Sequence, residues 1–185
     1  MKKNYLNVFF NGVLALSIMT VKLSCGLKKE LPQKEGKVYL KLRNDVGIYL
    51  KKSEESDKND INIFLNSMKK EYVNYQPEML ILDSIQQMDM PFFVEVYGGN
   101  WCSDTREGIP KLCKLLDELK FAEKNFQYFR IDHKMKLIDF PINKKLEKAP
   151  TVIVHDGRKE LGRIIESPKY KNWENDILKI LLSEY

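Results

Sequence analysis

The chain has 185 residues, 43% of them hydrophobic, and a formal net charge of +5. That length suits one domain of ordinary size with an extension, and the hydrophobic share is sufficient for a core. The basic residues occur as scattered pairs such as Lys51-Lys52 and Lys144-Lys145. Because nucleic-acid binding requires basic residues clustered on one face, the sequence argues against nucleic acid as a partner.

The N-terminus has the pattern of a secretory signal. Two lysines near the start precede an apolar stretch at 8–21, which is short for a bilayer span. The sequence LSCG at 23–26 follows and resembles the lipobox of bacterial lipoproteins, in which the cysteine becomes the lipidated first residue. The resemblance implies a signal peptide over 1–24 and a lipid on Cys25, which would anchor an exported protein to a membrane in the periplasm or at the outer membrane. An ordinary signal peptide cut nearby is the alternative.

Residues 25–60 are predicted to form a tether with a small β-hairpin. The stretch 26–37 is polar and lysine-rich, as tethers are. The segments VYLKL (38–42) and GIYLKK (47–52) alternate and flank RNDV, a pattern that favours two paired strands. The charged stretch 51–60 then separates this hairpin from the rest of the chain.

Two helices are predicted between residues 61 and 88. The first begins after Asp60, a good N-cap residue. Its apolar residues recur at helical spacing: Ile61, Phe64, Leu65, Met68 and Tyr72. A second, shorter helix is expected at about 78–88.

An apolar strand at 91–99 leads into a long helix after Cys102. The strand is apolar almost throughout, as expected when both of its faces are buried. The helix has one apolar face, which comprises Ile109, Leu112, Cys113, Leu116 and Leu119. A second strand is predicted at 125–132, and a short helix interrupted by Pro141 at 136–147.

A hairpin and a helix close the chain. Residues 149–166 predict two strands around Asp156-Gly157, which is a strong hairpin signal. An amphipathic helix that includes Trp173 and Ile177 follows. The first strand–helix–strand crossover makes a parallel pair, and the hairpin adds antiparallel strands. This order predicts an α/β fold with a mixed central sheet and helices on both faces.

The tryptophan–cysteine pair at the start of the long helix carries a family resemblance. Trp101-Cys102 follows an apolar strand, and Pro110 lies eight residues beyond the cysteine. Later, Ala149-Pro150-Thr151 opens a strand. With the hairpin and the closing helix, these features resemble the thioredoxin fold over residues 61–185. The resemblance implies a three-layer α/β domain preceded by an N-terminal extension.

The same resemblance implies roles for the residues around the cysteine. Cys102 is the nucleophile, Trp101 packs beside it, and Ala149-Pro150-Thr151 is a cis-proline step. In the family, the backbone of this step pairs with a substrate strand and keeps metals off the thiol. No cysteine–histidine spacing suggests a metal site, and no Gly-rich phosphate loop is found, so that neither a metal nor a cofactor is expected.

The physical chemistry of Cys102 supports a reactive thiol. The residue is predicted between a strand and a helix N-terminus, where unpaired N–H groups favour negative charge and so the reactive thiolate. Arg106, one turn further on, is expected to stabilise the thiolate, whereas Asp104 opposes it. The hydroxyl of Thr105 is expected to donate a hydrogen bond to it.

Two features of ordinary thioredoxins are missing. Thr105 stands where the resolving cysteine would be, and Val96 stands where the family carries a buried acid. Glu95 is adjacent, but a shift of one residue along a strand places its side chain on the other face. Cys113 lies eleven residues beyond Cys102 on one helix, about 16 Å away, too far for a disulfide, and is expected to be a core thiol.

The sequence therefore favours monothiol disulfide exchange through Cys102, with protein or small-thiol disulfides as partners. A non-catalytic binding module of the same fold is the alternative, because fold alone does not fix function. A thiol peroxidase is a third hypothesis. His133, at the end of a strand, is expected to be either a base near Cys102 or a solvated loop residue, and His155 is expected only to flank a turn.

Overall fold

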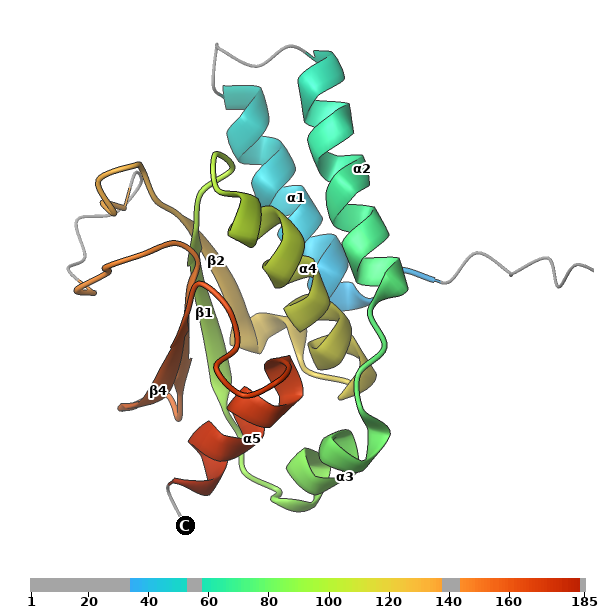
Figure 1. Ribbon diagram of the computed structural model, residues 1–185, viewed down its shortest axis with the longest axis vertical. Helices are drawn as coiled ribbons and strands as arrows, with labels where there is room; N and C mark the ends of the chain where they lie inside the picture. Colours follow the sequence, from blue (N-terminus) through green and yellow to red (C-terminus); the bar gives the residue numbers. More distant parts are fainter. Residues whose placement is uncertain (1–33, 53–57, 138–143, 184–185) are drawn as a thin grey trace, which may run out of the picture. The chain divides into compact units, whose positions relative to one another are not determined.

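The computed structural model describes residues 34–52, 58–137 and 144–183, which Figure 1 shows as the coloured ribbon. The chain divides into two compact units, Met1–Pro32 and Gln33–Tyr185, and every described residue belongs to the second unit. The predicted signal peptide and Cys25 lie outside the described residues. No helix among the described residues is long and apolar enough to cross a membrane.

A mixed four-stranded sheet forms the centre of the unit, as the sequence predicted, in the order β2-β1-β3-β4. The strands are β1 Phe93–Gly98, β2 Phe126–Arg130, β3 Thr151–His155 and β4 Glu160–Ile165. Strand β1 pairs in parallel with β2 and antiparallel with β3, and β3 pairs antiparallel with β4. The parallel pair follows from the helical crossover between β1 and β2, and the β3–β4 hairpin confirms the turn predicted at Asp156-Gly157.

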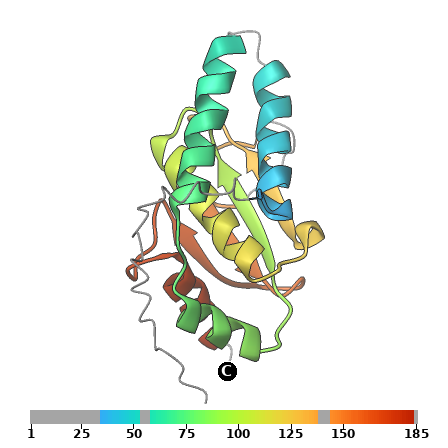
Figure 2. The same ribbon diagram turned by 90° about the vertical axis from the view of Figure 1, so that its right-hand side faces the viewer.

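Five α-helices are described, and a short 3-10 helix, Glu123–Asn125, precedes β2. The α-helices are α1 Lys37–Lys52, α2 Lys58–Asn74, α3 Met79–Gln87, α4 Ser103–Glu118 and α5 Trp173–Leu182. Helices α1 and α2 pack on α4, and α5 packs on α3 and β4 (Figures 1 and 2). The helices predicted at 78–88, after Cys102 and at the C-terminal end are thereby confirmed.

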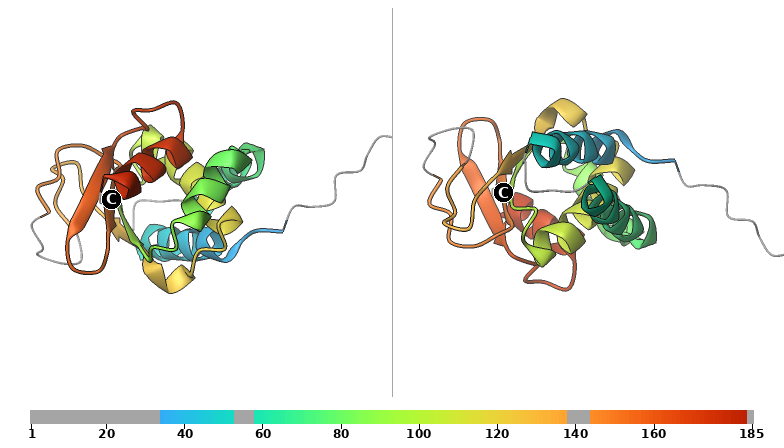
Figure 3. Two further views of the ribbon diagram at one scale, coloured as in Figure 1. Left: turned by 90° about the horizontal axis from the view of Figure 1, so that it is seen from below. Right: turned by 90° about the horizontal axis from the view of Figure 1, so that it is seen from above.

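The prediction of helices on both faces of the sheet is wrong for the described residues. Val94, Val96 and Val152 share one core with side chains from all five helices, and Figure 3 shows the helices gathered on one side of the sheet. On the opposite face, Tyr97 and Ile153 contact Ile131, Ala149 and residues of the segments around them. We call this surface the open face.

The open face lacks a described helix because the segments that cover it adopt turns. Ile131 forms a β-bridge with Leu137, and Met135 between them has a φ of 59°. Lys145 has a φ of 50°, a left-handed value that an α-helix cannot continue. The short helix predicted at 136–147 lies partly outside the described residues, and its described ends are not helical.

The predicted hairpin within residues 25–60 is also wrong, because residues 37–52 form the single helix α1. Val38, Leu42 and Val46 recur every four residues and are buried. That spacing places them on one helical face. Helix α1 shares the core of the rest of the unit, so the predicted domain boundary at residue 61 excludes a helix that belongs to the fold.

The predicted N-cap of α2 is misplaced as well. The helix begins at Lys58, so Asp60 lies inside its first turn.

Candidate functional site

Cys102 lies at the junction between β1 and α4, as predicted. It is the N-cap residue of α4, with φ −94° and ψ 125°, and its N–H donates to the carbonyl of Gly99 at 3.0 Å. The side chain is half-buried. The first N–H groups of a helix have no partner within the helix, and the Cys102 side chain accepts no hydrogen bond from them.

The Ala149-Pro150-Thr151 step lies against this cysteine. Cys102 Sγ donates a hydrogen bond to the carbonyl oxygen of Ala149 at 3.2 Å, and the Ala149-Pro150 peptide bond is cis, as expected. Thr151 is the first residue of β3, and its hydroxyl donates to the carbonyl of Lys148 at 2.7 Å. The structure therefore brings the predicted substrate-binding backbone into contact with the predicted nucleophile.

Trp101 forms an exposed wall of the site. Its side chain is 36% exposed, and its Nε1 donates to the carbonyl of Ile131 at 3.2 Å. Its ring stacks on His133, with 4.3 Å between ring centroids. His133 thus lies at the edge of the site and contacts the tryptophan, and this pairing was not predictable because the turn at 131–137 was unknown.

Thr105 lies beneath the turn that precedes Cys102. It is only 2% exposed, and a Cβ on Gly98 would lie 2.7 Å from its Cγ2, which explains the glycine at the end of β1. Its hydroxyl has no hydrogen-bond partner among the described residues. The expected hydrogen bond from Thr105 to Cys102 is therefore not formed in this structure.

Arg106 points toward helix α2. Its guanidinium carbon lies over the ring of Phe64, 5.8 Å from the centroid, an arrangement that gives a weak cation–π attraction. This contact does not support the expected stabilisation of the thiolate by Arg106, because the guanidinium contacts an aromatic side chain of α2.

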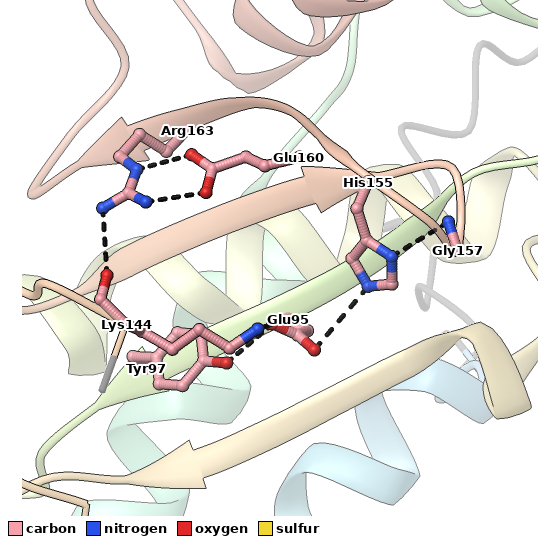
Figure 4. A network of polar contacts seen from close by, with 7 residues as sticks. All are labelled: Glu95, Tyr97, Lys144, His155, Gly157, Glu160 and Arg163. Carbon is pink, nitrogen blue, oxygen red and sulfur yellow. Dashed lines mark hydrogen bonds and ion pairs between the residues drawn. The ribbon is translucent and has the colours of Figure 1, made fainter. Parts of the chain in front are cut away.

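Val96 and Glu95 lie on opposite faces of β1, as the pleat requires. Val96 is buried on the helical side, whereas Glu95 lies on the open face in a polar network (Figure 4). Its Oε2 accepts from the Tyr97 hydroxyl at 2.6 Å and pairs with Lys144 Nζ at 2.8 Å. Burial alone would raise the pKa of Glu95, but the hydrogen bonds from Lys144 and Tyr97 outweigh it and leave that pKa below its usual value.

His155 also belongs to this network, which the sequence did not indicate. Its Nε2 lies 3.7 Å from Glu95 Oε1, and its Nδ1 accepts from the N–H of Gly157 at 3.1 Å. The residue does flank the turn, as expected, but it also reaches across to β1. His155 lies two residues after Ile153 on β3, and residues two apart on a strand share a face. Since Ile153 pairs with Glu95, this spacing is the signal that could have placed His155 on the same face as Glu95.

Cys113 is a core thiol, as predicted. It is 0% exposed, and burial raises its pKa well above the usual value, with a further contribution from Asp117. Cys102 and Cys113 are both free. A buried, protonated thiol is inert, so Cys113 has no part in chemistry at Cys102.

Iodoacetamide is therefore expected to label Cys102 in the folded protein at least about tenfold faster than Cys113. Mass spectrometry of the labelled peptides measures the two rates and separates both from Cys25. In denaturant the two cysteines should react at similar rates, which serves as the control. Equal labelling in the folded protein would contradict the burial of Cys113.

The fold and the site together define an α/β protein with a half-buried cysteine at a strand–helix junction. No protein-family model matches the chain, and no curated protein does. A protein of unknown function from Pseudomonas aeruginosa is similar in structure, with 18% sequence identity and a TM-score of 0.50 over 71% of this chain and 89% of that one. An HIV epitope scaffold has 17% identity and a TM-score of 0.50, over 78% of this chain and 98% of its own. At such identities the likeness concerns the fold alone.

Proposed function

We propose that the chain is a thioredoxin-like protein that carries out monothiol disulfide exchange through Cys102. The observation that carries the proposal is the hydrogen bond of 3.2 Å between Cys102 Sγ and the carbonyl of Ala149, at the N-terminus of α4. A nucleophilic thiol, a helix N-terminus and a backbone segment able to receive an extended chain meet at this point.

The proposed reaction has two steps. The Cys102 thiolate attacks one sulfur of a disulfide R–S–S–R′, forms the mixed disulfide Cys102–S–S–R, and releases R′S⁻, which takes up a proton. An external thiolate R″S⁻ then attacks the sulfur of R, forms R–S–S–R″ and returns the Cys102 thiolate. One disulfide is consumed and one is formed, so that no further oxidant or reductant is needed.

The residues around Cys102 suit this monothiol cycle. The thiolate has no proton to donate to Ala149, so ionisation frees that carbonyl for a substrate backbone. Thr105 supplies no second thiol, and Cys113 is buried. The described residues thus offer no second thiol to Cys102, and in this cycle the thiol that releases R comes from another molecule, either a small thiol or a second protein.

The test is catalysis of exchange between reduced glutathione and a mixed disulfide of a small thiol. The proposal expects a saturable rate above the uncatalysed reaction, together with a glutathione adduct on Cys102 that mass spectrometry detects. A rate equal to the uncatalysed one, with no adduct, would refute it.

A non-catalytic binding module is the second candidate. Two observations favour it: the Thr105 hydroxyl makes no hydrogen bond among the described residues, and Val96 supplies no acid beneath the site. On this hypothesis Cys102→Ala leaves capture of a partner unchanged, and affinity capture from envelope extracts with both forms of the chain decides the matter.

We also propose that the chain is exported and anchored through a lipid on Cys25, in the periplasm or at the outer membrane of a bacterium. The LSCG sequence supports this localisation. Expressed with labelled palmitate, the full chain is expected to take up label and to lose it in Cys25→Ala. Equal labelling of both, or of neither, would contradict the lipid anchor.

A further inference from the structure

The strongest polar cluster away from Cys102 lies on the open face, around the carboxylate of Glu95 (Figure 4). The Glu95 side chain is 16% exposed and its partner Lys144 is 32% exposed. Tyr97 donates to one carboxylate oxygen, and His155 lies near the other. Tyr97 and Lys144 therefore share one oxygen of this half-buried carboxylate, and His155 lies 3.7 Å from the other. Among these three partners, only Lys144 comes from outside the sheet.

Lys144 is the first residue of the segment 144–150, whose other end contacts Cys102. Arg163 of β4 holds the backbone of this segment, because its Nη1 lies 3.4 Å from the carbonyl oxygens of Lys144 and Lys145. Glu160 fixes the guanidinium through two hydrogen bonds of 2.6 and 2.7 Å. The segment is thus attached to β1 by the Lys144 side chain and to β4 by its backbone. Further along, Lys148 also pairs with Glu166, directly after β4, at 2.6 Å, but this pair is more exposed than that of Lys144 with Glu95.

The other end of the segment lies over the thiol. Leu146 packs against the small apolar cluster that contains Ile153 and Ala149, and Cys102 packs on the same cluster. Five residues after Lys144, the carbonyl of Ala149 accepts the hydrogen bond from Cys102 Sγ. A continuous set of contacts therefore runs from the Glu95 carboxylate to the sulfur of Cys102.

We propose that Glu95 is a positioning residue for the site, which acts by pairing with Lys144 and so holding residues 144–150 over Cys102. The effect of Glu95 on catalysis rests on the proposed exchange function, whereas the contacts that connect Glu95 to Cys102 do not depend on it. When the Glu95–Lys144 pair holds these residues in place, the Ala149 backbone restricts access to the thiol and presents a fixed edge to an incoming disulfide-bearing chain. When the pair is lost, the thiol becomes more accessible and the edge is no longer fixed.

The test compares Glu95→Gln and Lys144→Met with the wild type. Each variant is expected to raise the rate of Cys102 alkylation by about threefold to tenfold, which is the effect of losing a partly buried ion pair. Each is also expected to lower catalysed disulfide exchange by at least about twofold. A group that only stabilised the fold would not move these two rates in opposite directions while the protein stays folded.

Cys113 reports on whether the protein stays folded. Because Cys113 is 0% exposed, its alkylation requires the core to open, whereas release of residues 144–150 exposes Cys102 alone. The expected result is therefore faster labelling of Cys102 with Cys113 still protected. Labelling of both cysteines in step would overturn the inference, because it would show global opening.

A double variant and a matched control complete the design. Because Glu95 and Lys144 act as one pair, Glu95→Gln with Lys144→Met should raise the Cys102 rate no further than either change alone. The control, Glu71→Gln, breaks the pair of 3.2 Å with Lys111 and should leave the rate unchanged. Lys111 is as exposed as Lys144, whereas the Glu71 carboxylate is somewhat more exposed than that of Glu95.

The outcomes separate this inference from the proposed function. An unchanged Cys102 rate in both single variants, or multiplied effects in the double variant, would overturn the positioning role. If the wild type shows no catalysed exchange but the Cys102 rate still rises in both variants, the exchange function fails and the attachment of residues 144–150 by Glu95 stands.

Discussion

Replacing Cys102 by serine is expected to abolish catalysed disulfide exchange, with a loss of at least about a thousandfold. A serine hydroxyl stays protonated near neutral pH and forms no mixed disulfide, whereas a thiolate at the N-terminus of α4 does. Cys113 cannot take over, because it is fully buried and its pKa is raised. The measurement is the rate of exchange between reduced glutathione and a small mixed disulfide.

Cys113→Ala is the matched control for this change. It removes the other described thiol and should leave exchange within about twofold of the wild type, although a small core cavity lowers stability by about 1 kcal/mol. Exchange activity that survives Cys102→Ser would show that another group performs the reaction. Activity lost in Cys113→Ala, with the fold intact, would contradict the assignment of Cys113 to the core.

Replacing Asp117 by alanine is expected to lower the free energy of unfolding by about 2 kcal/mol. Asp117 lies on α4, but its carboxylate accepts from the N–H groups of Val38 and Tyr39, at 2.9 and 3.2 Å. It therefore caps α1 from another helix. The Tyr72 hydroxyl donates to it at 3.2 Å and accepts from Gly36, so alanine also leaves that hydroxyl without its acceptor. Urea unfolding followed by circular dichroism measures the loss.

The pH dependence of this loss provides a second check. Burial raises the pKa of Asp117 although the N–H groups of Val38 and Tyr39 oppose the shift. The folded state therefore binds the proton more tightly than the unfolded chain. The stability that Asp117 confers is accordingly largest at low pH and declines as the pH rises through the raised pKa.

Glu118→Ala is the control for the Asp117 variant. Glu118 is the neighbouring acid, 41% exposed, and pairs with Lys114, which is only 4% exposed, so its removal should cost about 1 kcal/mol, less than the loss of Asp117. If Asp117→Ala is no more destabilising than Glu118→Ala, the carboxylate does not hold α1 in place.

Apart from the helix predicted at 136–147, the strands and helices from residue 78 onward could be predicted because their patterns are distinct. Residues 91–99 are too apolar for anything but a buried element, and Asp156-Gly157 specifies a hairpin. Residues 37–52 were ambiguous, because Val38 and Leu42 satisfy both a strand alternation and a four-residue helical spacing. Val46 continues the helical spacing, but it was assigned to the connection RNDV of the predicted hairpin. The hydrogen bonds that cap the N-terminus of α1 come from Asp117, about eighty residues away. No local sequence pattern contains this interaction.

The position of the cysteine could also be predicted, whereas the orientations around it could not. A strand followed by a helix places Cys102 at the helix N-terminus, and this position does not depend on the surrounding side chains. The direction of Arg106 depends on Phe64 in another helix, and the burial of Thr105 depends on Gly98 above it. The network of Glu95 with Lys144 likewise depends on where Lys144 and the residues after it lie against the sheet, which is set by contacts with β1 and β4.

The decisive measurement for a catalytic Cys102 is the rate at which this cysteine reacts with oxidised glutathione. The experiment compares the folded full chain with the same chain in denaturant, and counts the adduct on the Cys102 peptide by mass spectrometry. We expect faster reaction in the folded protein even though the side chain is half-buried, because the fold holds the Cys102 sulfur at the start of α4 and against the Ala149 carbonyl, where a disulfide can be aligned for attack. A folded rate equal to or below the denatured rate would contradict a catalytic role for Cys102 and favour a binding module.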